Sequence, residues 1–276
     1  MGKLCCNPEP LQCVKIDNLF PSQIKIQFLH CLKTNYMKKY LWILVLPLVL
    51  SSCRYFMGKR VRGNGVVKTE ERSVTAFKNV EVGGAFKVYV SQGALKPVRI
   101  EADENLLQYI EIEQVGDRIS IRHKQGYNLD PHGDMKIYVT APVYNEIEVS
   151  GACDIIGEMK ISNPEDLSLG ASGAGNIKME VDAPKLSAEI SGSGTIDLKG
   201  QTKSVELGLS GAAEAHCFDL LAENAKVEIS GAGSADVYAS VKLTAEVSGA
   251  GTVNYKGNAT EVKQQVSGAG SVNKVN

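Results

Sequence analysis

Serine and glycine recur along the second half of the chain in one tetrapeptide, and such loops can bind phosphate or calcium. The tetrapeptide reads SGAC at Ser150, SGAG at Ser172, SGSG at Ser191, SGAA at Ser210, and SGAG at Ser230, Ser248 and Ser267. Phosphate loops continue into a Lys-Ser/Thr pair and a helix, and no copy here has that continuation. Calcium-binding nonapeptides place an aspartate two residues after the last glycine. In this chain an aspartate follows the last position of the tetrapeptide by three residues, at Asp197 and Asp236 only. The sequence therefore disfavours both a phosphate site and a calcium site.

Acidic side chains are the second group that could do chemistry. We assign the outward-facing acids of the repeats to one column: Glu148, Glu189, Glu206, Glu228 and Glu246. Carboxylates gathered on one face of a β-helix can cleave polysaccharides. A solvated face that keeps a repeat protein soluble is the alternative. We favour the solvated face, because Tyr238 and Tyr255 are the only tyrosines after residue 144 that could support a bound sugar.

Histidine and cysteine residues offer no pairing of a nucleophile with a base at recognisable spacing. His123 and His132 lie near a loop-like segment, and His216 is adjacent to Cys217. Cys153 and Cys217 fall three repeats apart, roughly 14 Å by strand spacing, which is too far for a disulfide. We therefore predict no catalytic residues, no metal site and no cofactor, and we interpret Cys217 as a small core residue.

The N-terminal region carries a lipid-attachment motif. Lys38 and Lys39 precede an apolar run that is short for a membrane span and ends in Leu50-Ser51-Ser52-Cys53. This resembles the bacterial lipobox, so residues 37–52 are predicted to be a lipoprotein signal peptide and Cys53 the lipidated residue. An ordinary signal peptide or N-terminal anchor is the alternative. We interpret residues 1–36 as an over-extended start and residues 53–73 as a linker.

The spacing of the tetrapeptides predicts the elements that position them. Successive serines are 22, 19, 19, 20, 18 and 19 residues apart, and a nearly fixed period indicates stacked repeats. Apolar residues alternate with polar ones on both sides of each tetrapeptide, as at Ile147, Val149 and Ile155. This alternation is typical of strands with one buried face. Each repeat is therefore predicted to be a strand, a corner, a second strand and a short return.

The glycines then have a structural explanation, because a corner between stacked strands requires a positive φ or a close approach of backbones. The corner glycines that follow the serines include Gly173, Gly192, Gly231, Gly249 and Gly268. A column of serines can also pass hydrogen bonds from one repeat to the next or to neighbouring backbone. We therefore predict that these residues shape the corners and do not bind a ligand themselves.

The region before Ser150 is less regular. The run EVGGAFKVYV, from Glu81, aligns with EISGSGTIDL, from Glu189; Gly83 replaces the serine and Phe86 the last glycine. This predicts a degenerate first rung within an irregular part that caps the solenoid. The fold class is therefore predicted to be all-β, a parallel β-helix (β-solenoid) of about seven to eight rungs of about 19 residues. A single domain is expected over residues 74–276, irregular over 74–145 and regular over 146–276.

The lipobox, the segment FKNVEVGGAFKVYVSQG, the pair IEIEQVGDRISIRHK and the EISGSGTIDL units together resemble the putative auto-transporter adhesin head GIN domain family. Its members are envelope proteins common in Bacteroidetes. The resemblance covers about Val74 to Val275 and implies a right-handed parallel β-helix with an adhesive role. The triplet Gly-Ile-Asn does not occur in this chain, and the nearest match is Gly175-Asn176-Ile177.

These features predict a non-enzymatic, lipid-anchored protein of the cell envelope. Arg54 follows Cys53 where an aspartate would be expected for inner-membrane retention, which favours the outer membrane. The predicted partners are the membrane, through Cys53, and a glycan or protein ligand. The net charge of −1 gives no indication of a nucleic-acid partner. Two alternatives stay open: a polysaccharide-active enzyme on the same scaffold, and a periplasm-facing structural or stress-related lipoprotein.

Overall fold

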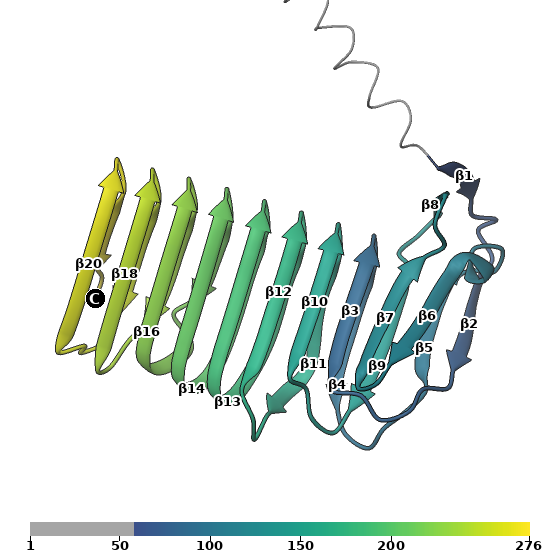
Figure 1. Cartoon of the computed structure of the whole chain (residues 1–276), viewed down its shortest axis with the longest axis horizontal. Coiled ribbons are helices and arrows are strands. Elements are labelled where there is room, and N and C mark those ends of the chain that lie inside the picture. Colours follow the sequence, from purple (N-terminus) through teal and green to yellow (C-terminus); the bar gives the residue numbers. More distant parts are fainter. Residues whose placement is uncertain (1–57) are drawn as a thin grey trace, which may run out of the picture. The chain divides into compact units, whose positions relative to one another are not determined.

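Strands account for almost all regular structure in residues 58–276, the part of the chain that the computed structural model describes. The only other element in this range is a single turn of 3-10 helix, η2 (Leu107–Tyr109). The strands stack side by side as a parallel β-solenoid (Figure 1), which confirms the predicted fold class. Residues 58–276 contain no helix with the length and apolar character needed to cross a bilayer.

The solenoid has two long faces, and successive strands of the regular repeats lie on one face and then on the other. The serine face contains the strand that leads into each corner. In spatial order it comprises β7 (Arg118–His123), β3 (Asn79–Gly84), β10 (Glu146–Gly151), β12 (Leu167–Gly173), the second halves of β13 (Asn176–Gly192) and β14 (Thr195–Gly211), then β16 (Leu220–Gly231), β18 (Lys242–Gly249) and β20 (Glu261–Gly268).

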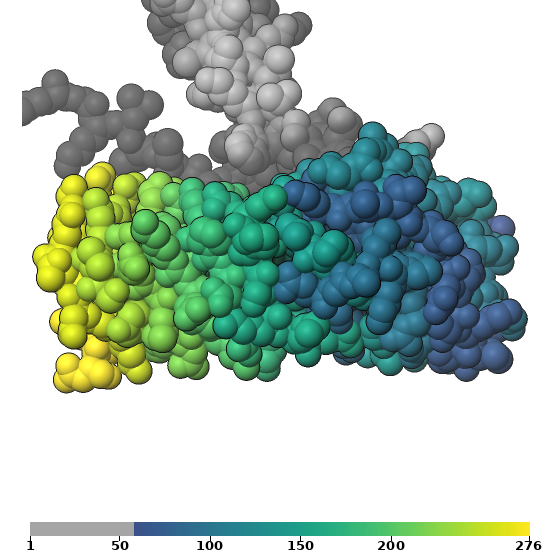
Figure 2. Space-filling view, turned by 90° about the horizontal axis from the view of Figure 1, so that it is seen from below, coloured from purple at the N-terminus to yellow at the C-terminus, as the bar shows by residue number. Residues whose placement is uncertain are grey.

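The opposite face contains the strand that follows each corner. In the same order it comprises β9 (Lys136–Ala141), β4 (Lys87–Gln92), β11 (Asp154–Ser162), the first halves of β13 and β14, then β15 (Glu214–Cys217), β17 (Ser234–Tyr238), β19 (Thr252–Lys256) and β21 (Ser271–Lys274). The space-filling view shows the rungs following one another as bands from the N-terminal part to the C-terminal rung (Figure 2).

The core lies between the two faces and is built from the alternating apolar positions. Parallel pairing places each inward residue beside its counterpart in the next rung, as Ile147 pairs with Leu169 and Ile155 with Ile177. Most of these residues are completely buried. Burial of one such side chain contributes about 1.5–3 kcal/mol, so every rung depends on a neighbour that covers its inward column.

The corners require glycine, as Gly192 shows. Its φ is +131°, and a Cβ on this residue would lie 2.2 Å from the carbonyl oxygen of Gly173 in the rung below. That oxygen accepts a hydrogen bond of 2.8 Å from the N–H of Ser193. The backbone ladder therefore continues through the corner, and a side chain here would interrupt it.

The N-terminal part extends beyond the rung that the sequence predicts to be first. The β3/β4 rung does align with the repeats, because Gly83 pairs with Ser150. However, the other edge of β3 pairs with β7, and that of β4 with β9. A rung that comes later in the chain therefore lies outside the β3/β4 rung. Three antiparallel strands, β6 (Ile110–Val115), β5 (Val98–Asp103) and β2 (Val67–Arg72), complete this end.

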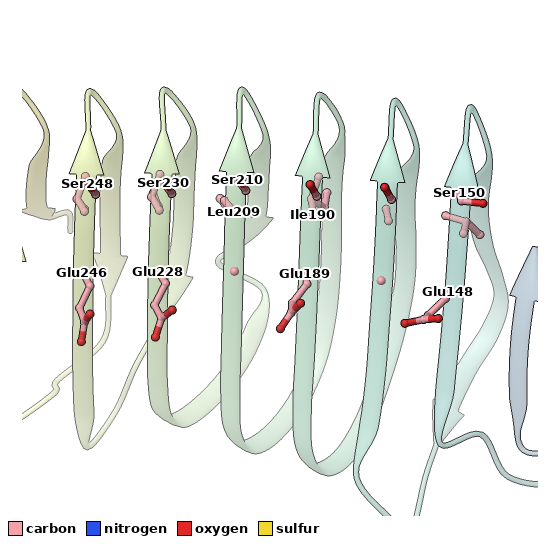
Figure 3. A pocket seen from close by; sticks show the side chains of 18 of the residues that line it. Glu148, Ser150, Glu189, Ile190, Leu209, Ser210, Glu228, Ser230, Glu246 and Ser248 are labelled. Atoms are coloured by element: carbon pink, nitrogen blue, oxygen red, sulfur yellow. The ribbon is translucent and has the colours of Figure 1, made fainter. Parts of the chain in front are cut away.

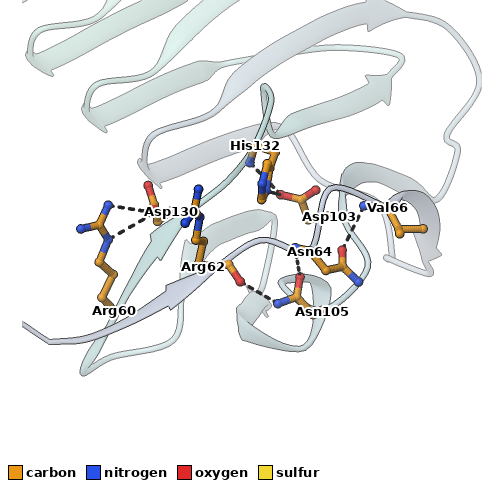
Figure 4. Close-up of polar contacts among 8 residues, drawn as sticks. All are labelled: Arg60, Arg62, Asn64, Val66, Asp103, Asn105, Asp130 and His132. Carbon is orange, nitrogen blue, oxygen red and sulfur yellow. Dashed lines mark hydrogen bonds and ion pairs between the residues drawn. The ribbon is translucent and has the colours of Figure 1, made fainter.

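A polar cluster ties the first described residues to this end (Figure 4). Strand β1 (Lys59–Arg62) pairs in parallel with β8 (Tyr127–Asp130). Both β1 and β2 lie within residues 53–73, the segment interpreted as a linker. The Asn105 side chain donates to the carbonyl oxygen of Arg62 (2.8 Å), and the His132 backbone N–H donates to the buried Asp103 carboxylate (2.9 Å). A Cβ on Gly63 would lie only 1.8 Å from that carboxylate. The segment is therefore closely packed against the solenoid.

Within residues 58–276, no rung covers the last strands of the solenoid, β20 and β21. Val266, in β20, is 42% exposed, whereas Val247 at the equivalent position one rung earlier is 2% exposed. Lys274 occupies the inward column after Tyr255. An inward-pointing charge at a sheet edge disfavours pairing with another chain, so the end rung carries a feature that protects it.

Candidate binding groove on the serine face

The outer surface of the serine face presents two parallel columns of side chains. The first contains the serines of the seven corners, because each is paired in register with the next, from Ser150 to Ser267. The second lies two residues earlier in each strand. In spatial order it contains Glu81, Glu148, Gly170, Glu189, Gly208, Glu228, Glu246 and Gln265.

One predicted member of the acidic column is wrong. Glu206 pairs with Ser187 and Lys226, which places it two residues before the column, and Gly208 occupies the expected position. The register is set by the corner serine, and Glu206 lies four residues before Ser210. The carboxylate column is therefore interrupted at two of the rungs.

The two columns line a shallow groove of about 730 Å³, which we call the serine groove. It extends from Glu81 to Ser267 across the regular rungs. All seven corner serines are exposed. Adjacent parallel strands lie about 4.8 Å apart, whereas hydroxyl hydrogen bonds require about 2.5–3.0 Å. Among residues 58–276 none of these hydroxyls forms a hydrogen bond, so the contacts between rungs or to backbone that a serine column allows do not form.

The glycines in the acidic column make room for the neighbouring glutamates (Figure 3). A Cβ on Gly170 would lie 3.3 Å from Cγ of Glu148, and a Cβ on Gly208 would lie 3.3 Å from Cγ of Glu189. Glu148 and Glu189 therefore lean over the adjacent glycine strands. Between Glu148 and Glu228 one carboxylate is present for every two rungs, which is a spacing of about 9.6 Å.

Basic residues neutralise only part of the groove. Arg118 forms an ion pair with Glu146 and lies 3.6 Å from Glu148, and Lys226 lies beside Glu228. Partial burial raises the pKa of Glu148, the neighbouring Glu146 raises it further, and Arg118 opposes both. Glu81, Glu189 and Glu246 have no ion pair with any residue in the range 58–276. The groove therefore offers hydroxyl groups as donors and acceptors, and carboxylates as acceptors.

The opposite face carries a polar column that satisfies itself. His216 lies 3.5 Å from Asp236, Asn254 donates to Asp236 (2.9 Å), and Asn273 donates to Asn254 (3.3 Å). No group of three or more histidine, cysteine or acidic residues within the described part of the chain could hold a metal ion. These contacts stabilise neighbouring rungs and leave few free groups for a ligand.

The two cysteines of the solenoid lie in the core as free thiols. Cys217 is 1% exposed, and burial raises its pKa to about 12. Burial also raises the pKa of Cys153. A nucleophilic cysteine must be accessible and ionised, so neither thiol is suited to catalysis. The predicted lipid-attachment residue, Cys53, lies outside the described residues.

An aromatic pair near the N-terminal end is also a structural contact. Tyr89 and Tyr138, on paired strands, stack with ring centroids 4.8 Å apart, and the Arg99 guanidinium covers the other face of Tyr138 at 3.6 Å. Sugars bind tyrosine through its ring face, and both faces of the Tyr138 ring are covered. The stack stabilises this end of the solenoid.

Comparison with known proteins places these features in a family. A family model described as "Putative auto-transporter adhesin, head GIN domain" matches residues 76–259. A search of curated proteins finds no match.

Solved structures of similar fold include proteins from Bacteroides and Parabacteroides. A putative adhesin from Bacteroides fragilis is 21% identical with a TM-score of 0.74, over 78% of this chain and all of that one. A putative lipid binding protein from Parabacteroides distasonis is 26% identical with a TM-score of 0.64, over 79% of this chain and all of that one. A putative adhesin from Parabacteroides merdae is 23% identical with a TM-score of 0.62, with the same coverage.

Proposed function

The chain belongs to the family of putative auto-transporter adhesins with a head GIN domain, and from this premise we propose that it binds an extended ligand along the serine groove. In this proposal it is a non-enzymatic protein, held in the cell envelope by a lipid on Cys53 and attached to the outer membrane. The resemblance to adhesins supports the binding role, and the lipobox supports the anchor.

The observation that carries this proposal is the straight column of exposed serine hydroxyls that form no hydrogen bond with any residue from 58 to 276. A ligand that repeats along its length can form the same contact at successive rungs, and linked contacts raise affinity without any single strong one. The column continues through all seven corners, from Ser150 to Ser267. A glycan or an extended peptide would suit this geometry better than a compact small molecule.

The alternative of a polysaccharide-active enzyme has less support from the geometry. Glycosidases place two carboxyl groups on either side of the scissile bond. The carboxylates here form one column along one side of the groove, and serines form the other. Turnover of a polysaccharide that is lost in Glu228→Gln would nevertheless favour the enzyme and overturn the non-enzymatic proposal.

Valine substitutions in the serine column test the groove. Ser191→Val and Ser210→Val add bulk at exposed strand positions where β-branched residues are tolerated. We expect the double variant to lose binding to envelope glycans and proteins immobilised on a surface. Ser187→Val is the matched control, because Ser187 lies on the same strand as Ser191 and on the same face but does not line the groove. Unchanged binding by the double variant would refute the groove as the site.

Protease treatment of intact cells tests the anchor and its orientation. For a lipid-anchored adhesin on the cell surface, we expect the protease to cleave the solenoid in intact cells. We also expect the Cys53→Ala variant to be released into the medium. Full protection in intact cells, with cleavage after outer-membrane permeabilisation, would favour the periplasm-facing lipoprotein.

A further inference from the structure

A second cavity continues the serine groove at its N-terminal end. It has a volume of about 950 Å³, and Ser150 lines both cavities. Beyond Ser150 the serine column continues with Gly83 and then Arg122. We call this cavity the corner pocket, because it forms where the β3/β4 corner departs from the Ser-Gly-Ala-Gly pattern.

The departure from the repeat creates the pocket. Gly83 stands in place of serine, and Phe86 stands in place of the last glycine. Gly84 has a φ of +136°, and a Cβ on it would lie 2.9 Å from the Phe86 ring and 3.2 Å from Nδ1 of His123. The imidazole and the phenyl ring therefore approach the bare backbone of Gly84, and any side chain at this position would fill part of the cavity.

Polar groups from the antiparallel pair β6 and β7 converge on the pocket. Glu111 and Glu113 come from β6, and Arg122 and His123 come from β7. Arg122 forms an ion pair with Glu113. Within residues 58–276 the side chains of Glu111 and His123 form neither an ion pair nor a hydrogen bond. A free carboxylate and a free imidazole thus line a cavity that has buried Phe86 and Met135 among its walls.

This set of groups matches the chemistry of a neutral sugar. Neighbouring ring hydroxyls can donate to a carboxylate and accept from a guanidinium, and an imidazole can do either. Apolar walls suit the C–H groups of a sugar ring. Two carboxylates against one guanidinium leave the pocket with a net negative charge when His123 is neutral, which disfavours an anionic sugar or a phosphate.

We propose that the corner pocket binds the terminal unit of a neutral linear polysaccharide whose following units lie along the serine groove. This inference rests on the proposed function, because it takes the groove as the site for the rest of the chain. The pocket recognises the end of the polymer, and the groove binds the repeat. Specificity for the terminal sugar then comes from Glu111, Arg122 and His123.

The test uses an array of neutral linear oligosaccharides that differ in terminal sugar, followed by calorimetric titration of a bound disaccharide and a bound hexasaccharide. Glu111→Gln and His123→Ala change side chains that are not buried, so the fold should persist, as circular dichroism can verify. We expect Glu111→Gln to bind both oligosaccharides about tenfold or more weakly, as is typical for loss of one hydrogen bond to a charged group. We expect His123→Ala to bind both about threefold to tenfold more weakly, as is typical for loss of one hydrogen bond to a neutral group. Glu206→Gln, outside both cavities, is the control and should bind like the parent.

The two proposals fail in different ways. If Ser191→Val/Ser210→Val weakens binding of the hexasaccharide only, and the pocket variants weaken binding of both ligands, both proposals hold. If the pocket variants bind both ligands like the parent, the pocket inference is overturned, whatever the groove variant shows. If the groove variant binds the hexasaccharide like the parent while the pocket variants weaken both ligands, the groove proposal fails and the pocket remains as an isolated sugar site. Tighter binding of a uronic-acid-terminated series, or no bound oligosaccharide at all, would overturn the assignment of a neutral sugar.

Discussion

The corner glycines allow a sharp test of the stacking argument, and Gly192→Ala is the most informative substitution. Gly192 lies in the middle of the regular rungs, at the end of β13. Alanine would have to adopt a φ of +131°, and its Cβ would lie 2.2 Å from the carbonyl oxygen of Gly173. That contact is far inside van der Waals distance with rigid backbone, so the corner must move.

The expected cost follows from two contributions. A non-glycine residue held in such a sparsely populated backbone region costs about 1–3 kcal/mol. Displacement of the corner also breaks the 2.8 Å hydrogen bond between Ser193 N–H and Gly173 O, which contributes about 0.5–1.5 kcal/mol. Together they predict a loss of about 1.5–4.5 kcal/mol in the free energy of unfolding.

Urea unfolding followed by far-ultraviolet circular dichroism measures this loss. Gly133→Ala is the matched control, because the φ of Gly133 lies outside the left-handed region and no heavy atom lies within 4 Å of the position that its Cβ would take. We expect the control to unfold like the parent. Because neighbouring rungs interact only with each other, the Gly192 variant could also unfold in two steps, which the slope of the transition would reveal. A Gly192 variant within about 0.5 kcal/mol of the control would refute the explanation of the corner.

Three further predictions concern other parts of the molecule. Glu148 should titrate above the ordinary glutamate range in NMR, and Arg118→Ala should raise its pKa further. Because the pKa of Glu148 is raised in the folded state, its contribution to the free energy of unfolding should increase as the pH falls through that pKa. Urea unfolding of the parent and of Glu148→Gln over a pH series measures this contribution. Lys274→Val should increase association at the C-terminal end, seen as a larger mass in light scattering at rising concentration; no change would count against a protective role. Gly63→Ala should destabilise the protein by about 1–3 kcal/mol, and Asp103→Ala should reduce that effect, because the obstructing carboxylate is gone; additive costs in a thermal unfolding cycle would contradict the contact.

The regular part of the fold is predictable because parallel stacking transmits register. Once Ser150 and Ser172 are equivalent, residues at the same short distance from each serine are equivalent too, and Ile147 and Ile155 become core positions. The placement of Glu206 in the acidic column is wrong. Its residue type fits the column, but it lies four residues before Ser210 in the sequence, whereas the column lies two residues before each serine. Residue type alone allows hydrogen bonds between the corner serines, but the strand spacing exceeds the reach of a hydroxyl, so these bonds do not form among residues 58–276.

The N-terminal part is not predictable to the same degree, for a physical reason. Strand β3 pairs along one edge with β10 and along the other with β7, whose residues follow it in the chain by several strands. Such an insertion leaves no periodic signal, because the two pairings have different sequence separations. The corner pocket arises from this arrangement, so sequence can mark Gly83 and Phe86 as departures from the pattern but cannot show that β6 and β7 lie beside them.

The distribution of departures from the repeat indicates where specificity can reside in a solenoid. A regular column gives every rung the same chemistry, so a ligand on it can slide by one rung at little cost in contacts. A fixed position on the polymer requires a feature that occurs once, and the β3/β4 corner is such a feature at one end of the groove. Gly170 and Gly208 add a second departure, because they set the carboxylates from Glu148 to Glu228 two rungs apart. A ligand held at its end by the pocket would therefore meet Glu148 and Glu189 at fixed units along its length, and shortening the oligosaccharide until it no longer reaches Glu189 should remove the effect of Glu189→Gln on affinity.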